Sequence, residues 1–341
     1  FDLIGVGAGP AGAMAAWTAA RGGKKVLLLD RAAELPRYKP CGGGIPASLW
    51  RHVPELEPAR FVDVVVTRLR HSYKGRATAL FELQAGAAGT AEIWMVQRPR
   101  FDKYLVDEAV AAGARLELAA RARSVKTHER GVTVELADGR SLTARYLIGA
   151  DGATGVVGAQ LGLRTHMHRR QGIARELELP FVDETSDGQC HPRLFHGAAY
   201  LEYGTVAGGY AWIFPKRGAL SVGAGVLHSA AAAADAEQRA GVVLKNAIEA
   251  LLASVGIKLQ PEAVPRLWAH PIPEWSPEGA LHTADGRALL AGDAAGVVQP
   301  LFGEGIQYAM RSGILAAQCV LAEEVTAYTD RLDRKSTRLN S

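Results

Sequence analysis

The sequence predicts a mixed α/β fold, in which a discontinuous Rossmann-type domain is interrupted by a mostly antiparallel β-sheet domain. An apolar run, a glycine-rich turn and a helix-forming stretch follow one another at the start of the chain, and a similar rhythm returns near its end. The middle of the chain is instead rich in strand-like segments. Because 341 residues exceed the size at which one hydrophobic core usually stops growing, we expect two domains.

The opening residues predict a βαβ unit. Residues 2–6 form an apolar run that enters a glycine-rich turn, residues 13–21 are strong helix formers, and residues 25–30 form a second apolar run. Farther along, apolar positions spaced for one helix face predict a helix over 101–112. The turn at 137–140 predicts a hairpin.

The remaining elements are predicted in chain order. We expect strand-like segments within 61–96, hairpin strands at 132–136 and 142–148, strands at 211–214, 219–227 and 288–291, a helix in the alanine run 230–234, and a helix over 306–325. The cofactor domain is predicted at 1–65, 97–165 and 278–330, and the substrate domain at 66–96 and 166–277. Residues 331–341 have no apolar period and are predicted to be a non-native or disordered tail, and both ends of the chain are expected to be incomplete.

The composition excludes several classes of function. Charged residues make up 22% of the chain and the net charge is only +4, with no basic cluster, so we expect no nucleic-acid partner. The three cysteines lie far apart, which argues against a disulfide framework or a metal cluster and favours a cytoplasmic setting. No apolar run is long enough to span a bilayer, which leaves peripheral membrane contact open. His166 and His168 lack a third ligand, so no metal is assigned.

The first glycine-rich turn predicts a dinucleotide site. Gly7, Gly9 and Gly12 permit a tight turn and a close approach of the backbone to a pyrophosphate, and the helix that starts at Pro10 and Ala11 directs N–H groups toward it. Asp30 follows Gly12 by 18 residues, where a carboxylate can accept hydrogen bonds from a ribose, and Arg31 beside it is also placed at the cofactor. The alternative is that this turn only connects a helix and a strand and binds no ligand.

Three separated segments resemble the FAD-binding group typified by p-hydroxybenzoate hydroxylase. The first is the opening βαβ unit; the second is 149–154, which contains Asp151 and Gly152; the third is 291–296, which contains Gly292 and Asp293 and is followed by Pro300, Gly303, Gly305 and Ile306. The resemblance implies FAD as cofactor. It also implies that Asp293 binds the ribityl chain and that the next helix starts near the flavin.

Two other positions bear on this resemblance. Arg98 matches an arginine that lies near the cofactor in this group, whereas the blander interpretation is a solvated charge at a helix start. The group usually continues its Asp-Gly motif with a serine and an arginine, where this chain has Gly155 and Gly158. This departure weakens the prediction of nicotinamide-nucleotide docking more than the prediction of FAD binding.

Two further motifs resemble the geranylgeranyl reductase family. Residues 36–44 contain Cys41, Gly42, Gly43 and Gly44, and residues 210–216 read Tyr-Ala-Trp-Ile-Phe-Pro-Lys. The resemblance covers residues 1 to about 325, and the helical C-terminal part usual in the family is expected to be missing. It implies reduction of carbon–carbon double bonds in a prenyl chain of a lipid or chlorophyll-type substrate, with FAD as the hydride carrier and NAD(P)H or ferredoxin as reductant.

Both motifs also have physical interpretations. The glycines leave room for a planar ring or a thin alkyl chain, and Tyr210, Trp212 and Phe214 share one strand face that suits an apolar substrate or belongs to an ordinary core. Cys41, Tyr210 and Trp212 are the predicted catalytic residues, and Cys41, Gly42 and Gly43 are also placed at the cofactor. Cys41 either positions or protonates the alkene beside the flavin or only fills a small space.

Two other functions compete with this prediction. A flavin monooxygenase or halogenase would carry equally good FAD motifs, although the cysteine–glycine loop counts against it. A prenyl-binding protein without flavin chemistry could keep a related fold, although the intact glycine and aspartate motifs count against that function.

Overall fold

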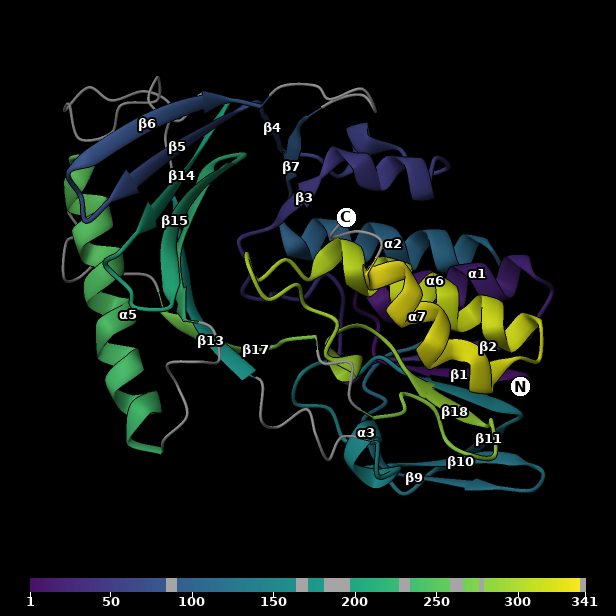
Figure 1. The fold of residues 1–341 in the computed structure, drawn as a ribbon. Helices are drawn as coiled ribbons and strands as arrows, with labels where there is room; N and C mark the ends of the chain where they lie inside the picture. Colours follow the sequence, from purple (N-terminus) through teal and green to yellow (C-terminus); the bar gives the residue numbers. More distant parts are fainter. Residues whose placement is uncertain are drawn as a thin grey trace. The chain divides into compact units, whose positions relative to one another are not determined.

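The computed structural model describes residues 1–83, 91–163, 171–180, 197–226, 234–257, 266–275 and 279–337, and the chain divides into two compact units (Figure 1). Unit 1 comprises Phe1–Arg37, Asp102–Arg170 and Pro273–Ser341; unit 2 comprises Tyr38–Phe101 and Gln171–Ile272. The predicted domains follow the same interrupted order. However, the first segment of unit 1 ends at Arg37 rather than at the predicted residue 65, so the cysteine–glycine loop belongs to unit 2.

Unit 1 is built on a five-stranded sheet in the order β18-β12-β1-β2-β8. Its strands are all paired in parallel: β1 (Leu3–Val6), β2 (Val26–Leu29), β8 (Arg115–Glu117), β12 (Tyr146–Gly149) and β18 (Ala288–Leu290). The strands β1, β2, β12 and β18 are buried along their whole length, which explains why they read as continuous apolar runs. The predicted βαβ unit is confirmed.

The helices of unit 1 include a closely packed pair, α1 (Pro10–Arg21) and α6 (Ile306–Leu321). A Cβ atom added at Gly313 would lie 2.1 Å from the carbonyl oxygen of Ala11, so glycine allows the two helices to touch. Helix α6 ends at Leu321 rather than at the predicted residue 325. Unit 1 also contains most of α2 (Arg98–Ala111) and the shorter segments α3 (Val157–Gln160), η6 (Gly292–Ala295), η7 (Val325–Ala327) and α7 (Tyr328–Thr337).

The predicted tail, residues 331–341, overlaps the end of helix α7. Residues up to Thr337 form the end of α7, in which Leu332 is buried and Arg331 pairs with Glu324. The buried face of α7 is marked by Tyr328 and Leu332, four residues apart, and the predicted boundary at 330 separated these two residues. Residues 338–341 lie outside the described part of the chain.

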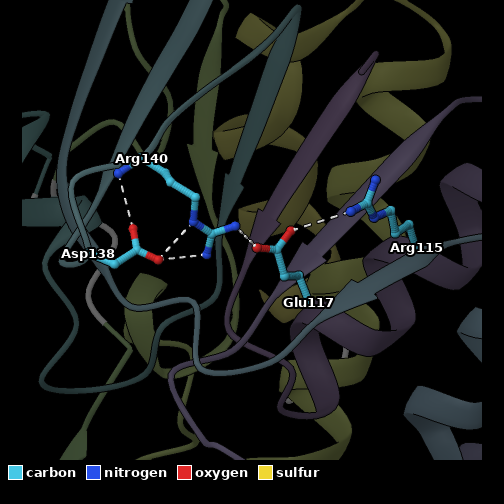
Figure 2. Close-up of polar contacts among 4 residues, drawn as sticks. All are labelled: Arg115, Glu117, Asp138 and Arg140. Atoms are coloured by element: carbon cyan, nitrogen blue, oxygen red, sulfur yellow. Dashed lines mark hydrogen bonds and ion pairs between the residues drawn. The ribbon is translucent and has the colours of Figure 1, made fainter.

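A second sheet of unit 1 contains β9 (Ala122–His128), β10 (Gly131–Leu136) and β11 (Ser141–Ala144). The predicted hairpin is confirmed, since Glu135 pairs with Ser141 across the turn. The predicted strand 142–148 is in fact two strands, because the chain leaves β11 and enters the parallel sheet as β12. Arg140 of the turn contacts Asp138 and Glu117 of β8, which ties the hairpin to the parallel sheet (Figure 2).

Unit 2 contains a seven-stranded sheet in the order β17-β13-β16-β15-β14-β5-β6. These strands are β5 (Arg68–Tyr73), β6 (Ala77–Glu82), β13 (Gln171–Pro180), β14 (Ala198–Tyr203), β15 (Gly209–Lys216), β16 (Ala219–Val226) and β17 (Trp268–Pro273). Most pairs are antiparallel, whereas β14 and β5 run parallel. The remainder of unit 2 includes a small sheet, β3 (Gly44–Pro46), β7 (Ile93–Met95) and β4 (Val64–Val66), two 3₁₀ turns, η1 (Ala47–His52) and η2 (Pro58–Arg60), and the start of α2 (Arg98–Ala111), which continues into unit 1.

One face of the large sheet is covered by helix α5 (Ala234–Ser254), which the sequence analysis did not predict. Its buried residues pack with the apolar side chains of β13, β15 and β16: Leu244, Ala247, Ile248, Leu251 and Leu252. Their spacing of three and four residues is typical of an amphipathic helix and could have revealed α5. The predicted alanine-run helix at 230–234 lies, except for Ala234, outside the described residues. No described helix is long and apolar enough to cross a membrane.

Candidate active site

The glycine turn of unit 1 lies against the residues that begin the second motif. A Cβ atom at Gly7 would lie 2.3 Å from the carbonyl oxygen of Ala150, and Gly7 has a φ of +101°. A Cβ atom at Gly12 would lie 1.8 Å from the carbonyl oxygen of Gly7. Gly9 begins α1 and no side chain caps this helix, so the turn presents backbone N–H groups as a phosphate-binding turn does.

Asp30 lies at the end of β2 and braces this turn. Its carboxylate is buried and accepts hydrogen bonds from the N–H groups of Ala8 and Ala32, each at 2.8 Å. Each carboxylate oxygen can accept more than one hydrogen bond, so a ribose hydroxyl is also compatible with these contacts. Arg31 is exposed, and its predicted role stays a prediction.

Arg37 is a candidate cofactor residue that the sequence analysis missed. Its Nε atom lies 3.6 Å from Asp30 Oδ2, and one guanidinium nitrogen lies 3.9 Å from Asp102 Oδ2. The same nitrogen would be 3.6 Å from a Cβ atom at Gly9. A cation therefore lies directly beside the glycine turn, where a pyrophosphate would need one. Arg37 belongs to the segment 36–44 that carries the cysteine–glycine motif, and this membership could have indicated it.

The contacts of Asp151 in the second motif explain why glycine stands at position 155, where the FAD-binding group usually has a larger residue. The Asp151 carboxylate accepts hydrogen bonds from the N–H groups of Val156 and Val157, at 2.5 and 3.0 Å, and so caps α3. A Cβ atom at Gly155 would lie 2.0 Å from Asp151 Cγ, so any larger residue would displace this carboxylate. Gly152 has a φ of +80° and makes the turn before α3. Direct contact of Asp151 or Gly152 with a cofactor stays a prediction.

The third motif meets the first within unit 1. Gly292 has a φ of +63°, and a Cβ atom there would lie 2.7 Å from Ala11 Cβ. Asp293 Oδ1 would lie 3.8 Å from a Cβ atom at Gly305, the residue before α6, and no side chain caps α6. Ile306 is buried at the start of α6, Gly303 has a φ of +64°, and Pro300 is exposed.

These observations fit FAD. The structure brings the three motifs of unit 1 together, with two helix starts that lack side-chain caps and a carboxylate beside one of them. Such N–H groups suit phosphates and the negative charge of a reduced flavin. Gly7, Gly9, Gly12, Asp30, Arg37 and Asp293 are therefore the residues that would hold the cofactor.

We expect Asp30→Ala and Asp293→Ala each to weaken FAD binding about tenfold or more. The first would lose the brace of the glycine turn and its predicted role as a ribose acceptor, and the second would lose its predicted role as a ribityl acceptor; charged hydrogen bonds contribute roughly 1.5–3 kcal/mol. The measurement is the FAD dissociation constant by flavin fluorescence, with Asp285→Ala, an exposed turn residue of the same unit, as control. Wild-type affinity in both variants would remove the two assignments.

Unit 2 holds the cysteine–glycine loop by both backbone groups of Cys41. The Lys216 ammonium, whose side chain is fully buried, donates to the Cys41 carbonyl oxygen at 3.1 Å and pairs with Glu178 at 2.7 Å. The Cys41 N–H donates to the Glu176 carboxyl group, which also accepts from the Ser221 hydroxyl at 3.2 Å. Strands β13 and β15 thus fix the position of the cysteine.

The glycines of this loop allow close contacts rather than leaving open space. A Cβ atom at Gly42 would lie 2.9 Å from the Phe214 ring and 3.3 Å from Trp212 Nε1. Gly43 has a φ of +75°, and a Cβ atom there would lie 2.2 Å from the Val96 carbonyl oxygen. The expectation that Gly42 leaves room for a ring or alkyl chain is corrected, because aromatic side chains already fill that space.

The predicted aromatic face is present on β15. Neighbouring ring centroids lie 5.9 Å apart for Tyr210 and Trp212 and 6.0 Å apart for Trp212 and Phe214. Trp212 is buried over Gly223, where a Cβ atom would lie 2.2 Å from its ring, so Trp212 also serves as core. Tyr210 and Phe214 are half-buried.

Burial raises the pKa of Glu176 to about 7, although the nearby Lys216 lowers it. When folding raises the pKa of a carboxyl group, that group destabilises the folded state progressively as the pH rises from its pKa in the unfolded state to its pKa in the folded state. Between about pH 4.5 and pH 7 the group therefore removes up to about 3 kcal/mol of stability. Its Oε2 atom is buried without a hydrogen-bond partner, which is consistent with a protonated carboxyl group.

We therefore expect Glu176→Gln to flatten the fall in unfolding free energy between pH 5 and pH 7. The amide cannot ionise, so the variant should become more stable than wild type as the pH rises. Denaturant melts at three pH values measure the effect, with the exposed helix residue Glu249 changed to Gln as control. An unchanged pH slope for Glu176→Gln would show that Glu176 stays ionised.

The remaining residues singled out in the sequence are Arg98, His166 and His168. Arg98 is buried in unit 2 at the start of α2, which contradicts the interpretation of a solvated charge, and its contact with a cofactor stays a prediction. His166 and His168 lie outside the described residues, and within the described ranges no group of three potential ligands could hold a metal ion.

Comparisons with known proteins agree with this geometry. The family described as FAD binding domain matches residues 2–339. Digeranylgeranylglycerophospholipid reductase 1 of Methanopyrus kandleri is 31% identical over 325 residues, which cover 93% of this chain and 80% of that protein. Menaquinone reductase of Mycobacterium tuberculosis is 33% identical over 339 residues, with coverage of 93% and 76%.

A solved structure has the same fold. A geranylgeranyl bacteriochlorophyll reductase-like protein from Thermoplasma acidophilum matches with a TM-score of 0.78 and 24% identity, over 99% of this chain and 82% of that one. At this identity the likeness concerns the fold alone.

Proposed function

We propose that this chain, which belongs to the FAD binding domain family and within it to the geranylgeranyl reductases, reduces carbon–carbon double bonds of a prenyl chain. The observation that carries the proposal is the cysteine–glycine loop, which the buried Lys216 ammonium holds against Trp212 and Phe214. Relatives named as reductases of digeranylgeranylglycerophospholipid and menaquinone support a prenyl lipid as substrate.

The two units divide the work. Bound FAD supplies the two-electron reduction of the double bond. Unit 1 would bind and orient the cofactor through its glycine turn, Arg37 and the start of α6. Unit 2 would bind the alkene through its aromatic side chains, which exclude water, while Cys41 supplies or positions a proton for the neighbouring carbon. NAD(P)H or ferredoxin would recharge the flavin, and contact with the membrane would be peripheral.

We expect Cys41→Ser to slow alkene reduction at least tenfold, about 1.4 kcal/mol, with FAD still bound. Because backbone contacts hold this position, the substitution should leave the loop in place and change only the side chain. Single-turnover oxidation of the reduced flavin by a prenyl substrate measures the step, and the flavin spectrum and melting temperature serve as controls. An unaltered rate would assign Cys41 a packing role.

The function itself is tested by lipid mass spectrometry after co-expression with an unsaturated prenyl-lipid pathway. A reductase should add two hydrogen atoms for each reduced bond and should work under strict anaerobiosis. A monooxygenase or halogenase requires oxygen, so loss of activity without oxygen would favour that alternative. A purified protein without flavin colour or flavin binding would contradict the proposal altogether.

A further inference from the structure

The aromatic face of unit 2 extends well beyond the Tyr-x-Trp-x-Phe signature. Successive ring centroids lie 5.2 to 6.1 Å apart along a path that crosses β6, β5 and β14 and then follows β15: Phe81, His71, Tyr203, Tyr210, Trp212 and Phe214. His71 and Tyr203 are stacked, with an interplanar angle of 7°. We name this path the aromatic track; it runs from the edge strand β6 to the cysteine–glycine loop.

The strand register places the whole track on one face of the sheet. Tyr203 pairs with Tyr210 across β14 and β15, and His71 pairs with Ala79 across β5 and β6. Residues two apart on a strand share a face, so Phe81 lies on the side of Ala79. Helix α5 covers the opposite face, where Tyr200 and Ile213 belong to the core. The track is therefore separate from the helix-covered core.

The outer end of the track opens into a recess of about 600 Å³. His71, Tyr73, Phe81 and Tyr203 contribute to its lining, which is mostly apolar. Phe81 and Tyr73 are 54% and 56% exposed, so aromatic surface remains uncovered at the sheet edge. Burial lowers the pKa of His71, which keeps its imidazole uncharged near neutral pH.

We infer that the aromatic track and its recess form a chain-length subsite, which binds the part of the prenyl chain distant from the double bond being reduced. The inference rests on the proposed function and deepens it. An apolar chain gains affinity with each methylene that leaves water, and the exposed and half-buried rings of the track, from Phe81 to Tyr210, offer apolar surface with few charged groups. The lining favours the hydrocarbon over a charged headgroup.

The subsite predicts an effect that depends on chain length. Phe81→Ala should weaken binding of a twenty-carbon prenyl alcohol about tenfold, whereas binding of the ten-carbon homologue should stay within about twofold. Leu80→Ala is the matched control, because Leu80 is similarly exposed on the same strand but points to the other face. Phe81→Trp keeps an aromatic ring and should retain the wild-type affinity.

Equilibrium dialysis of the FAD-loaded protein against radiolabelled alcohols measures these affinities without turnover. Equal losses for both chain lengths, or equal effects of Phe81→Ala and Leu80→Ala, would overturn the subsite. So would loss of vesicle binding by Phe81→Ala with unchanged alcohol affinity, since that result would make the face a membrane contact. If the wild type binds the long alcohol through Phe81 but reduces no prenyl chain, the proposed function fails and the subsite remains.

Discussion

Replacing Gly12 by alanine is expected to abolish FAD retention and to lower the free energy of unfolding by about 3 kcal/mol or more. The added Cβ atom would lie 1.8 Å from the carbonyl oxygen of Gly7 and 3.3 Å from Ala150 Cβ. The nearest of these atoms is backbone, so no side-chain rotation relieves the overlap. Helix α1 would have to move away from the sheet, and the phosphate-binding turn would open with it.

Gly9→Ala is the matched control for this experiment. A Cβ atom at Gly9 meets only the flexible end of Arg37 at 3.6 Å, and its φ of −80° suits alanine. We expect this variant to fold with nearly wild-type stability while binding FAD less tightly, because a methyl group would occupy the phosphate approach. Denaturant melts and the flavin content after gel filtration separate the two effects. Normal flavin content in Gly12→Ala would contradict the assigned role of the turn.

The elements that the sequence predicts best are those with local causes. The glycine turn, the two runs around it and the hairpin at 137–140 follow from backbone conformation and from apolar runs of strand length. Strand β12 was merged with β11 because only one residue, Arg145, separates them. For α5, the prediction placed a helix only in the alanine run 230–234, whereas the regular apolar spacing farther along the chain marks the longer helix.

The candidate site likewise contains residues that a local pattern reveals and residues that only tertiary folding brings together. The residues of the glycine and aspartate motifs are visible in the sequence because their spacing is fixed by one turn. Arg37, Glu176 and Lys216 are not visible in this way, since tertiary folding brings Arg37 to Gly9 and β13 to Cys41. The extension of the aromatic face to Phe81 likewise depends on the parallel pairing of β14 with β5, which no local pattern indicates.

Removal of the buried cation at Lys216 is the second change with a large expected effect. Lys216→Ala should lower the free energy of unfolding by about 1–3 kcal/mol, because it removes a fully buried side chain and a charged hydrogen bond, whereas water can partly solvate the remaining Glu178 carboxylate, which is 26% exposed. Glu178 would lose its ion pair, and the Cys41 carbonyl would lose its donor. The loop should then loosen, so alkene reduction should fall more than FAD binding.

The exposed pair Lys245–Glu249 provides the matched control, since Lys245→Ala removes the same residue type from an ion pair of 3.7 Å. Exposed pairs contribute only about 0 to 1 kcal/mol, so this variant should melt almost as wild type does. The loss in Lys216→Ala should be larger at pH 8 than at pH 5. Lys216 lowers the pKa of Glu176, so its removal makes ionisation of that carboxyl group more costly at high pH. Denaturant melts at both pH values measure this difference, and equal losses would contradict the coupling of Lys216 to Glu176.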